Sequence, residues 1–126
     1  MERQSYIIKM AKELLTNYTL PSRYKIKLQF YINSGKLLYV KNFNREIKTR
    51  SGKIHAKVFG TASERTKIIR ITSLCWSYHH EDMRLVDYQI KHTILHEIDH
   101  ILTGNSLHPG GLVAYTARIT ALMGGR

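Results

Sequence analysis

The sequence predicts a single α+β domain in which helices pack on one face of a small sheet. Apolar residues recur at helical spacing near both ends of the chain, whereas they alternate with polar residues through much of the middle. The length of 126 residues suits one domain, with no Pro- or Gly-rich linker and no internal repeat to divide it. The expected order is an N-terminal helix, a mostly antiparallel sheet of three or four strands, and two C-terminal helices.

The first two elements are expected to be a helix and a strand. Apolar side chains in residues 7–18 are spaced three and four apart, as on one side of a helix, and Pro21 follows shortly after. In residues 24–32 every second side chain is apolar, from Tyr24 to Ile32. Such alternation is typical of a half-buried strand.

Further strands are expected in the middle of the chain. Residues 36–40 and 52–59 are candidates, and residues 67–72 (KIIRIT) form the segment richest in β-branched side chains. Residues 43–51 are polar and basic, and residues 61–65 are expected to form a polar connection.

Two helices are expected to end the chain. In residues 87–102 the apolar period becomes helical, and Gly104 is placed to cap that helix. The last helix spans residues 112–123. The stripe that should face the core from the first of these helices consists of isoleucines: Ile90, Ile94, Ile98 and Ile101.

Composition excludes several classes of protein. No apolar run approaches the roughly 20 residues of a membrane helix, and the N-terminus lacks the apolar region of a signal peptide. Cys75 is the only cysteine, which excludes an internal disulfide and a zinc finger with paired cysteines. We therefore expect an intracellular protein, either cytoplasmic or associated with the nucleoid or nucleus.

The formal net charge is +11, from 20 Lys and Arg against 9 Asp and Glu, which favours an anionic partner. The first 80 residues carry 16 basic and 4 acidic side chains, whereas the remainder carries 4 and 5. The cations are densest from Lys41 to Arg70, and three aromatic rings are interleaved with them: Phe43, His55 and Phe59. Nonspecific DNA or RNA binding is the favoured interpretation. A solvated sheet edge or an acidic protein partner would also explain this segment.

The motif with the clearest chemistry is His96-Glu97-Ile98-Asp99-His100, an HExxH within the helix expected at residues 87–102. Histidines four apart on a helix lie about 6 Å apart on one face, so both imidazoles can reach one zinc ion. Glu97 would lie beside the metal, where a carboxylate serves as general base towards water. The motif predicts one catalytic Zn²⁺ with Glu97 as the catalytic residue. The alternative is a solvated helix that is merely rich in His and acidic residues.

A catalytic zinc needs a third protein ligand and an open fourth position. His108 is favoured, because it lies eight residues after His100 and beyond the break at Gly104. His92 is the rival. A straight helix separates His92 from His100 by about 12 Å along its axis, so one ion cannot bind His92, His96 and His100 together.

Other residues near the motif receive more modest roles. Asp99 is expected to point away from the metal, either supporting the ligands or lying at the helix surface. Tyr115 and Arg118 are candidates for stabilising an oxyanion, although core packing and a surface charge, respectively, are the favoured interpretations. Cys75 is expected to pack in the core beside Trp76.

These residues resemble the SprT-like, or Spartan-type, zinc metallopeptidases. That family combines a strand reading I-x-L-S, a helix with LLHExxH and a third histidine that precedes the final helix. The matching segments are Ile69-Arg70-Ile71-Thr72-Ser73, Ile94-Leu95-His96-Glu97 through His100, and His108 with Leu112 and Ile119 after it. The likeness is good over residues 65–122.

The resemblance implies a zincin-like fold, zinc bound by His96, His100 and His108, and cleavage of proteins associated with or crosslinked to DNA. This chain departs from the family at Pro109, where glycine is usual, and at Leu112, where a bulky aromatic residue is usual. The spacer between His100 and His108 is short, and the C-terminal zinc ribbon is absent.

Three other functions stay open. Peptide deformylases share the wording HExDH, but the sequence lacks their glycine-rich GxGLAAxQ stretch, and the surroundings of Cys75 match their EGCLS segment poorly. The protein could be a nucleic-acid-binding module with a structural or inactive zinc site. It could also be a peptidase with no nucleic-acid role. If the protein is a zinc metallopeptidase, as the motif favours, its substrates are expected to be proteins or peptides. No membrane partner is expected.

Overall fold

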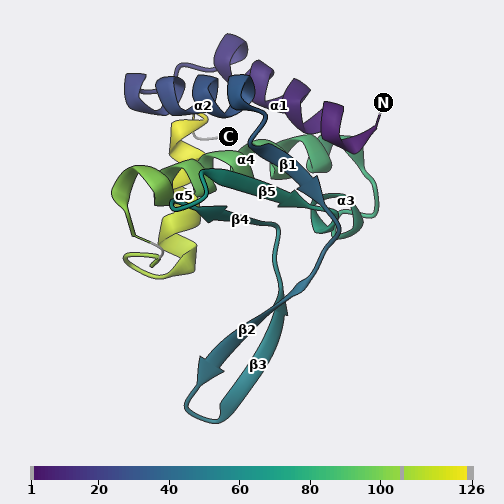
Figure 1. The fold of residues 1–126 in the computed structure, drawn as a ribbon, viewed down its shortest axis with the longest axis vertical. Helices are drawn as coiled ribbons and strands as arrows, with labels where there is room; N and C mark the ends of the chain where they lie inside the picture. Colours follow the sequence, from purple (N-terminus) through teal and green to yellow (C-terminus); the bar gives the residue numbers. More distant parts are fainter. Residues whose placement is uncertain (1, 106, 125–126) are drawn as a thin grey trace.

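One long helix, α4, lies behind a three-stranded sheet at the centre of the fold (Figure 1). The structure, a computed structural model, describes residues 2–105 and 107–124. The elements follow in the order α1 (Arg3–Asn17), α2 (Ser22–Ser34), β1 (Leu37–Val40), β2 (Asn44–Thr49), β3 (Gly52–Lys57), β4 (Gly60–Ser63), β5 (Ile68–Thr72), α3 (Leu74–Ser77), α4 (Met83–Thr103) and α5 (Leu112–Leu122). The predicted α+β class is confirmed.

The strands form two separate sheets rather than one. The larger has the order β1–β5–β4, with β1 parallel and β4 antiparallel to β5. The smaller is the antiparallel pair β2 and β3. The strands predicted at residues 36–40, 52–59 and 67–72 are present as β1, β3 and β5. No strand was expected in residues 43–51, which contain β2, or in residues 61–65, which overlap with β4.

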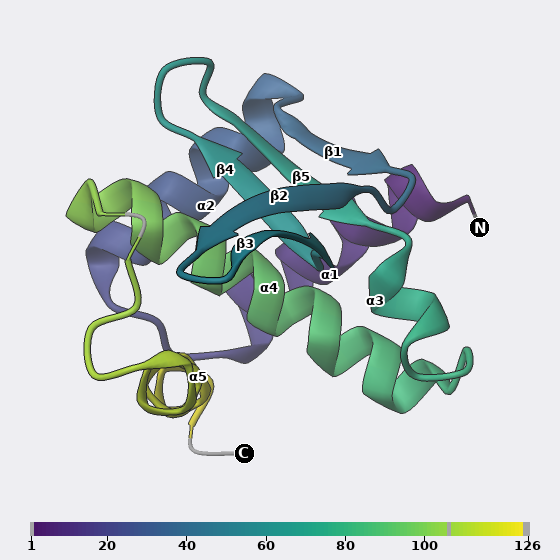
Figure 2. The same cartoon turned by 90° about the horizontal axis from the view of Figure 1, so that it is seen from below.

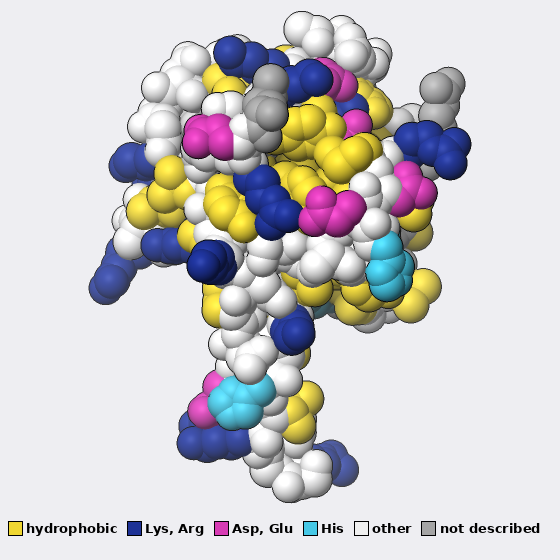
Figure 3. Space-filling view, turned by 90° about the vertical axis from the view of Figure 1, so that its right-hand side faces the viewer, with side chains coloured by type: hydrophobic (Ala, Val, Ile, Leu, Met, Phe, Trp, Pro, Cys, Tyr) yellow, Lys and Arg dark blue, Asp and Glu magenta, His cyan; other side chains and the backbone are white. Residues whose placement is uncertain are grey.

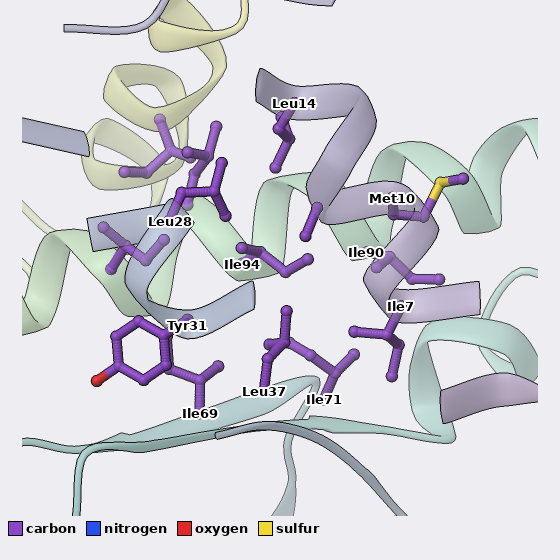
Figure 4. Close-up of a cluster of buried hydrophobic side chains, with 14 of the residues drawn as sticks. Ile7, Met10, Leu14, Leu28, Tyr31, Leu37, Ile69, Ile71, Ile90 and Ile94 are labelled. Atoms are coloured by element: carbon purple, nitrogen blue, oxygen red, sulfur yellow. The ribbon is translucent and has the colours of Figure 1, made fainter. Parts of the chain in front are cut away.

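The core lies between the larger sheet and helices α1, α2 and α4 (Figure 4). Each layer contributes fully buried side chains at the spacing that its geometry requires, every second residue in β5 and every third or fourth in the helices. The layers contribute Ile7, Met10 and Leu14 from α1, Leu28 and Tyr31 from α2, Ile90 and Ile94 from α4, and Leu37, Ile69 and Ile71 from the sheet.

The strand predicted at residues 24–32 is wrong, because this segment is helix α2. Its buried residues are Tyr24, Leu28 and Tyr31, spaced four and three apart, whereas Ile26 is largely exposed. The alternation of apolar residues is therefore incidental, and packing against α1 and α4 selects the helical period instead. Gly35 ends the helix in the left-handed conformation, with φ 69°.

Strands β2 and β3 form a hairpin that extends away from the rest of the fold (Figure 1). We call residues 44–57 the arm. Every residue of β2 is exposed. The arm is fixed at its base, where the Ser73 hydroxyl accepts from the Asn42 N–H at 2.8 Å and the Phe59 carbonyl accepts from the Thr72 N–H at 2.9 Å.

Seen from below, α4 lies between β4 on one side and α5 on the other (Figure 2). The predicted C-terminal helices are thus both present, and Gly104 caps α4 with φ 63°. Among the described residues, no helix is long and apolar enough to cross a membrane.

Candidate metal centre and catalytic cavity

Helix α4 supplies the first two histidines. The Asp82 carboxylate caps its N-terminus by accepting from the Arg84 N–H at 3.2 Å, and the Gly104 N–H donates to carbonyls of the last turn. The isoleucine stripe is buried as predicted, which fixes the rotation of the helix about its axis. His96 and His100 consequently lie side by side on a half-buried neighbouring face, with ring centroids 4.6 Å apart.

The chain returns after Gly104 and brings His108 to the same place. One ring nitrogen from each of His96, His100 and His108 lies within 4.8 Å of the others. The Nε2 atoms of His96 and His108 are 3.2 Å apart. Two nitrogens that bind one tetrahedral zinc at 2.0–2.1 Å are separated by about 3.3 Å. The cluster could therefore hold one metal ion, and the His96–His108 pair has the spacing of zinc ligands.

The protonation of the cluster also suits a metal. Burial, together with the neighbouring His100 and His108, lowers the pKa of His96 to about 3. Burial lowers the pKa of His108 as well. Imidazoles that stay neutral keep the lone pair that a metal ion requires. The Nδ1–H of His100 donates to the Asn105 carbonyl at 2.7 Å, which leaves its Nε2 free to act as a ligand.

Glu97 is buried beside this cluster and faces the same cavity as the three histidines. Burial raises its pKa to about 7, while the positive charge of Arg45 acts in the opposite direction. A carboxylate with a pKa near neutrality can both take up and release a proton under physiological conditions. Its location agrees with the predicted catalytic role.

Asp99 lies on another face of α4 from Glu97 and is completely buried, so the helix-surface interpretation is wrong. Its carboxylate accepts hydrogen bonds from the hydroxyls of Tyr24 and Tyr115 and from the Arg118 guanidinium, the last at 2.7 Å. This network joins α2, α4 and α5. Arg118 is committed to Asp99 and, among the described residues, neither Arg118 nor Tyr115 lines the cavity. Neither is therefore placed to stabilise an oxyanion.

Tyr115 packs in the core, as predicted, but against the histidines. Its ring stacks on that of His100 and meets the rings of His96 and His108 at steep angles. His92 lies apart from the cluster, with its ring centroid 6.4 Å from that of His96. The Nε2–H of His92 donates to the Thr116 carbonyl at 3.2 Å, which fixes it as part of the cavity wall.

The histidines and Glu97 form the floor of a cavity of about 640 Å³ between β4, α4 and α5. Arg45 and Lys57, at the base of the arm, border it on a further side. Gly60 allows β4 to approach α4. A Cβ atom there would lie 2.6 Å from the Thr93 side chain and 2.9 Å from the Arg70 carbonyl.

Sequence reasoning did not identify Gly60, Arg45 or Tyr24 as residues of the site or of its supports. The one signal available in the sequence was Gly60 itself, because a glycine in a strand often marks a place where another segment approaches the backbone closely. Cys75 is buried in the core with Trp76, as predicted, and burial raises its pKa to about 12. It does not belong to the metal-binding group found among the described residues.

Comparisons with models of known protein families, with curated proteins and with solved structures give no match for this chain.

Proposed function

We propose that this protein is a zinc metallopeptidase of the SprT-like type with a zincin-like fold. The observation that carries the proposal is the convergence of three imidazoles and one buried carboxylate in a single cavity. His96, His100 and His108 would hold the ion. Zn²⁺ bound there would supply Lewis-acid chemistry to the peptide carbonyl and to water.

Glu97 is the general base in this proposal. It accepts a proton from the attacking water and then passes that proton to the leaving amine, so the carboxylate is regenerated. The buried Cys75 lies in the core rather than with the histidines, which favours a peptidase over a deformylase-like enzyme.

The substrate would bind as an extended segment along β4. Within the described part of the chain, β4 pairs with β5 alone, and its other edge is left free beside the cavity. A free strand edge beside a cavity can add one more strand through main-chain hydrogen bonds. The strands β3 and β5 are less suited to this role, because β3 lies in the arm and β5 is the central strand of the larger sheet.

Metal analysis and proteolysis together test the proposal. Protein purified without a histidine tag should bind about one equivalent of zinc, as should the His92→Ala variant. His100→Ala and His108→Ala should bind less than about half an equivalent. Glu97→Gln should keep its zinc and lose peptidase activity. Full activity in Glu97→Gln, or full zinc content in His108→Ala, would contradict the assigned roles.

A second candidate function, nucleic-acid binding, is favoured by the charge of the arm. The arm carries five cations and one carboxylate: Arg45, Lys48, Arg50, Lys53 and Lys57 against Glu46. A two-stranded β-ribbon can enter the major groove of DNA, and the cations of the arm can neutralise phosphates there. The proposed substrates would then be DNA-associated proteins, and the protein would act in the cytoplasm or at the nucleoid or nucleus.

Binding and cleavage must be measured on the same preparation to separate the candidates. Salt-dependent binding to DNA without cleavage of any bound protein would favour a binding module with a structural zinc site. Cleavage with negligible DNA affinity near physiological salt would favour a peptidase that has no nucleic-acid role.

A further inference from the structure

The two faces of the arm differ in chemistry. In an antiparallel pair, directly opposed residues point to the same side. The register opposes Ile47 to Ile54 and, two residues along each strand, Arg45 to Ala56. One face therefore carries two isoleucines, an alanine and an arginine. The other carries mostly charged or polar side chains, with Lys48 opposed to Lys53.

The apolar face of the arm reaches the cavity through Arg45, whereas Lys57, of the other face, lines the cavity at the base of the arm. Arg45 belongs to this face and lines the cavity together with Glu97 and His108. Hydrophobic side chains gather on one side of the projecting arm, whereas His and acidic side chains lie on the other side (Figure 3). Ile47 and Ile54 are 40% and 50% exposed and do not belong to the packed core.

A second exposed apolar surface borders the cavity across from the arm. Leu112 begins α5 and is one of the residues that line the cavity, yet it is 60% exposed. Val113, next to it, is exposed as well. Apolar side chains thus flank the cavity on two sides, which is typical of a surface that binds a partner.

Positive charges outnumber negative charges among the described residues that line the cavity. Arg45 and Lys57 border it, and Glu97 is the one carboxylate among its described lining residues. Arg45 makes no ion pair with any described residue. Its guanidinium is therefore available to an incoming carboxylate, which it can bind through two parallel hydrogen bonds.

We propose that the apolar face of the arm is part of the substrate-binding surface, and that the substrate is an extended polypeptide with apolar side chains and an acidic residue near the cleaved bond. This inference rests on the proposed peptidase function. Ile47 and Ile54 would contact the apolar side chains outside the cavity. Arg45 would bind the acidic side chain at its entrance.

Three fluorescent peptides of equal length test the inference. The first combines apolar residues with a central glutamate, the second replaces that glutamate by lysine, and the third replaces the apolar residues by serine. Binding is measured by fluorescence anisotropy with the Glu97→Gln variant, so that it does not depend on turnover. Cleavage is measured with the wild-type protein.

The first peptide should bind about tenfold more tightly than either of the others, as expected for the burial of a few apolar side chains and for one charge-assisted contact. Replacing both Ile47 and Ile54 by serine should weaken binding of the first peptide about tenfold. Arg45→Gln should abolish the preference for glutamate over lysine. Because these three residues lie on the exposed arm, zinc content and the unfolding midpoint should not change.

Matched controls are Ile26→Ser, an isoleucine on α2 that is 70% exposed and outside the cavity lining, and Arg84→Gln at the start of α4. Neither should alter peptide binding. Unchanged affinity in the Ile47 and Ile54 double variant, or an unchanged preference in Arg45→Gln, overturns the inference. If the wild type cleaves no peptide, the peptidase function fails, while the anisotropy data still test the binding surface separately.

Discussion

The ring of Tyr115 stacks on the imidazole of His100, with centroids 5.1 Å apart and ring planes 11° from parallel. The hydroxyl of the same tyrosine donates to the buried carboxylate of Asp99. The pair thus connects the histidine cluster to the buried hydrogen-bond network of Asp99. Through it, α5 holds the imidazole in the orientation that the cluster requires.

Removing the Tyr115 ring should weaken metal binding. We expect Tyr115→Leu to lower zinc affinity about 10- to 100-fold, the usual effect of removing a group that orients a ligand. Tyr115→Phe keeps the stacked ring and should bind zinc nearly as tightly as the wild type. Competition with a zinc-binding dye measures both affinities, and equal losses in the two variants would contradict a role for the ring.

Removing the Asp99 carboxylate should destabilise the fold. Asp99→Ala leaves two tyrosine hydroxyls without their acceptor and should lower the free energy of unfolding by about 2–4 kcal/mol. Arg118→Ala should cost less, because the arginine side chain is 44% exposed and its charge is screened by water. Urea unfolding measures both changes. A larger loss in Arg118→Ala than in Asp99→Ala would contradict this order.

The metal-free protein should lose stability as the pH rises. Burial raises the pKa of Glu97 from 4.5 to about 7, so the folded state binds this proton more tightly than the unfolded state. That contribution to stability is fully present below about pH 4.5 and is lost as the pH rises through about 7. In chelator-treated protein, the free energy of unfolding of Glu97→Gln should therefore exceed that of the wild type by about 3 kcal/mol above pH 8. At about pH 5 the two free energies should differ little.

Denaturant unfolding at the two pH values, with the chelator present throughout, measures this difference. If the difference in the free energy of unfolding between Glu97→Gln and the wild type is the same at both pH values, Glu97 is not buried in the folded protein.

The arm should account for much of the salt dependence of DNA binding, if DNA is a partner. Replacing Lys48 and Lys53 by glutamine removes two charges and should reduce the slope of log affinity against log salt by about 2 for duplex DNA. Removing two lysines of the helical body, Lys12 and Lys25, is the matched control and should leave the slope almost unchanged. Equal reductions in both double variants would assign the effect to net charge instead of to the arm.

Local patterns in the sequence were sufficient to predict α4 and its histidines. The isoleucine stripe defines one face of that helix, and the HExxH spacing then places His96 and His100 together on another. Both relationships lie within about three turns of one helix, so they depend on backbone geometry alone. Gly104 and His108 follow within eight residues of His100.

Helix α2 was mispredicted because its sequence satisfies two periods at once. Tyr24 and Leu28 fit both an alternating and a helical pattern, and the exposed Ile26 is apolar without being in the core. Only the packing against α1 and α4 distinguishes the two, and that packing joins segments distant in the sequence.

The Asp99 network could not be predicted from neighbouring residues. Its members Tyr24 and Asp99 are 75 positions apart, and the sequence around each gives no sign of the other. The two faces of the arm were hidden for a related reason. Composition reveals that the segment is basic, but the strand register decides which side chains share the face with Arg45.

The arm enters and leaves the body at neighbouring points, next to Ser73 at one end and Thr72 at the other. Its residues contribute little to the core, so mutations along it cost little free energy of unfolding and can accumulate quickly. The three histidines of the candidate metal centre and Glu97 come from other elements, and only Arg45 and Lys57 at the base of the arm line their cavity. If the arm binds substrate as proposed, substrate preference can diverge between related proteins while the histidine cluster stays constant, and exchanging the arm between them would alter specificity by design.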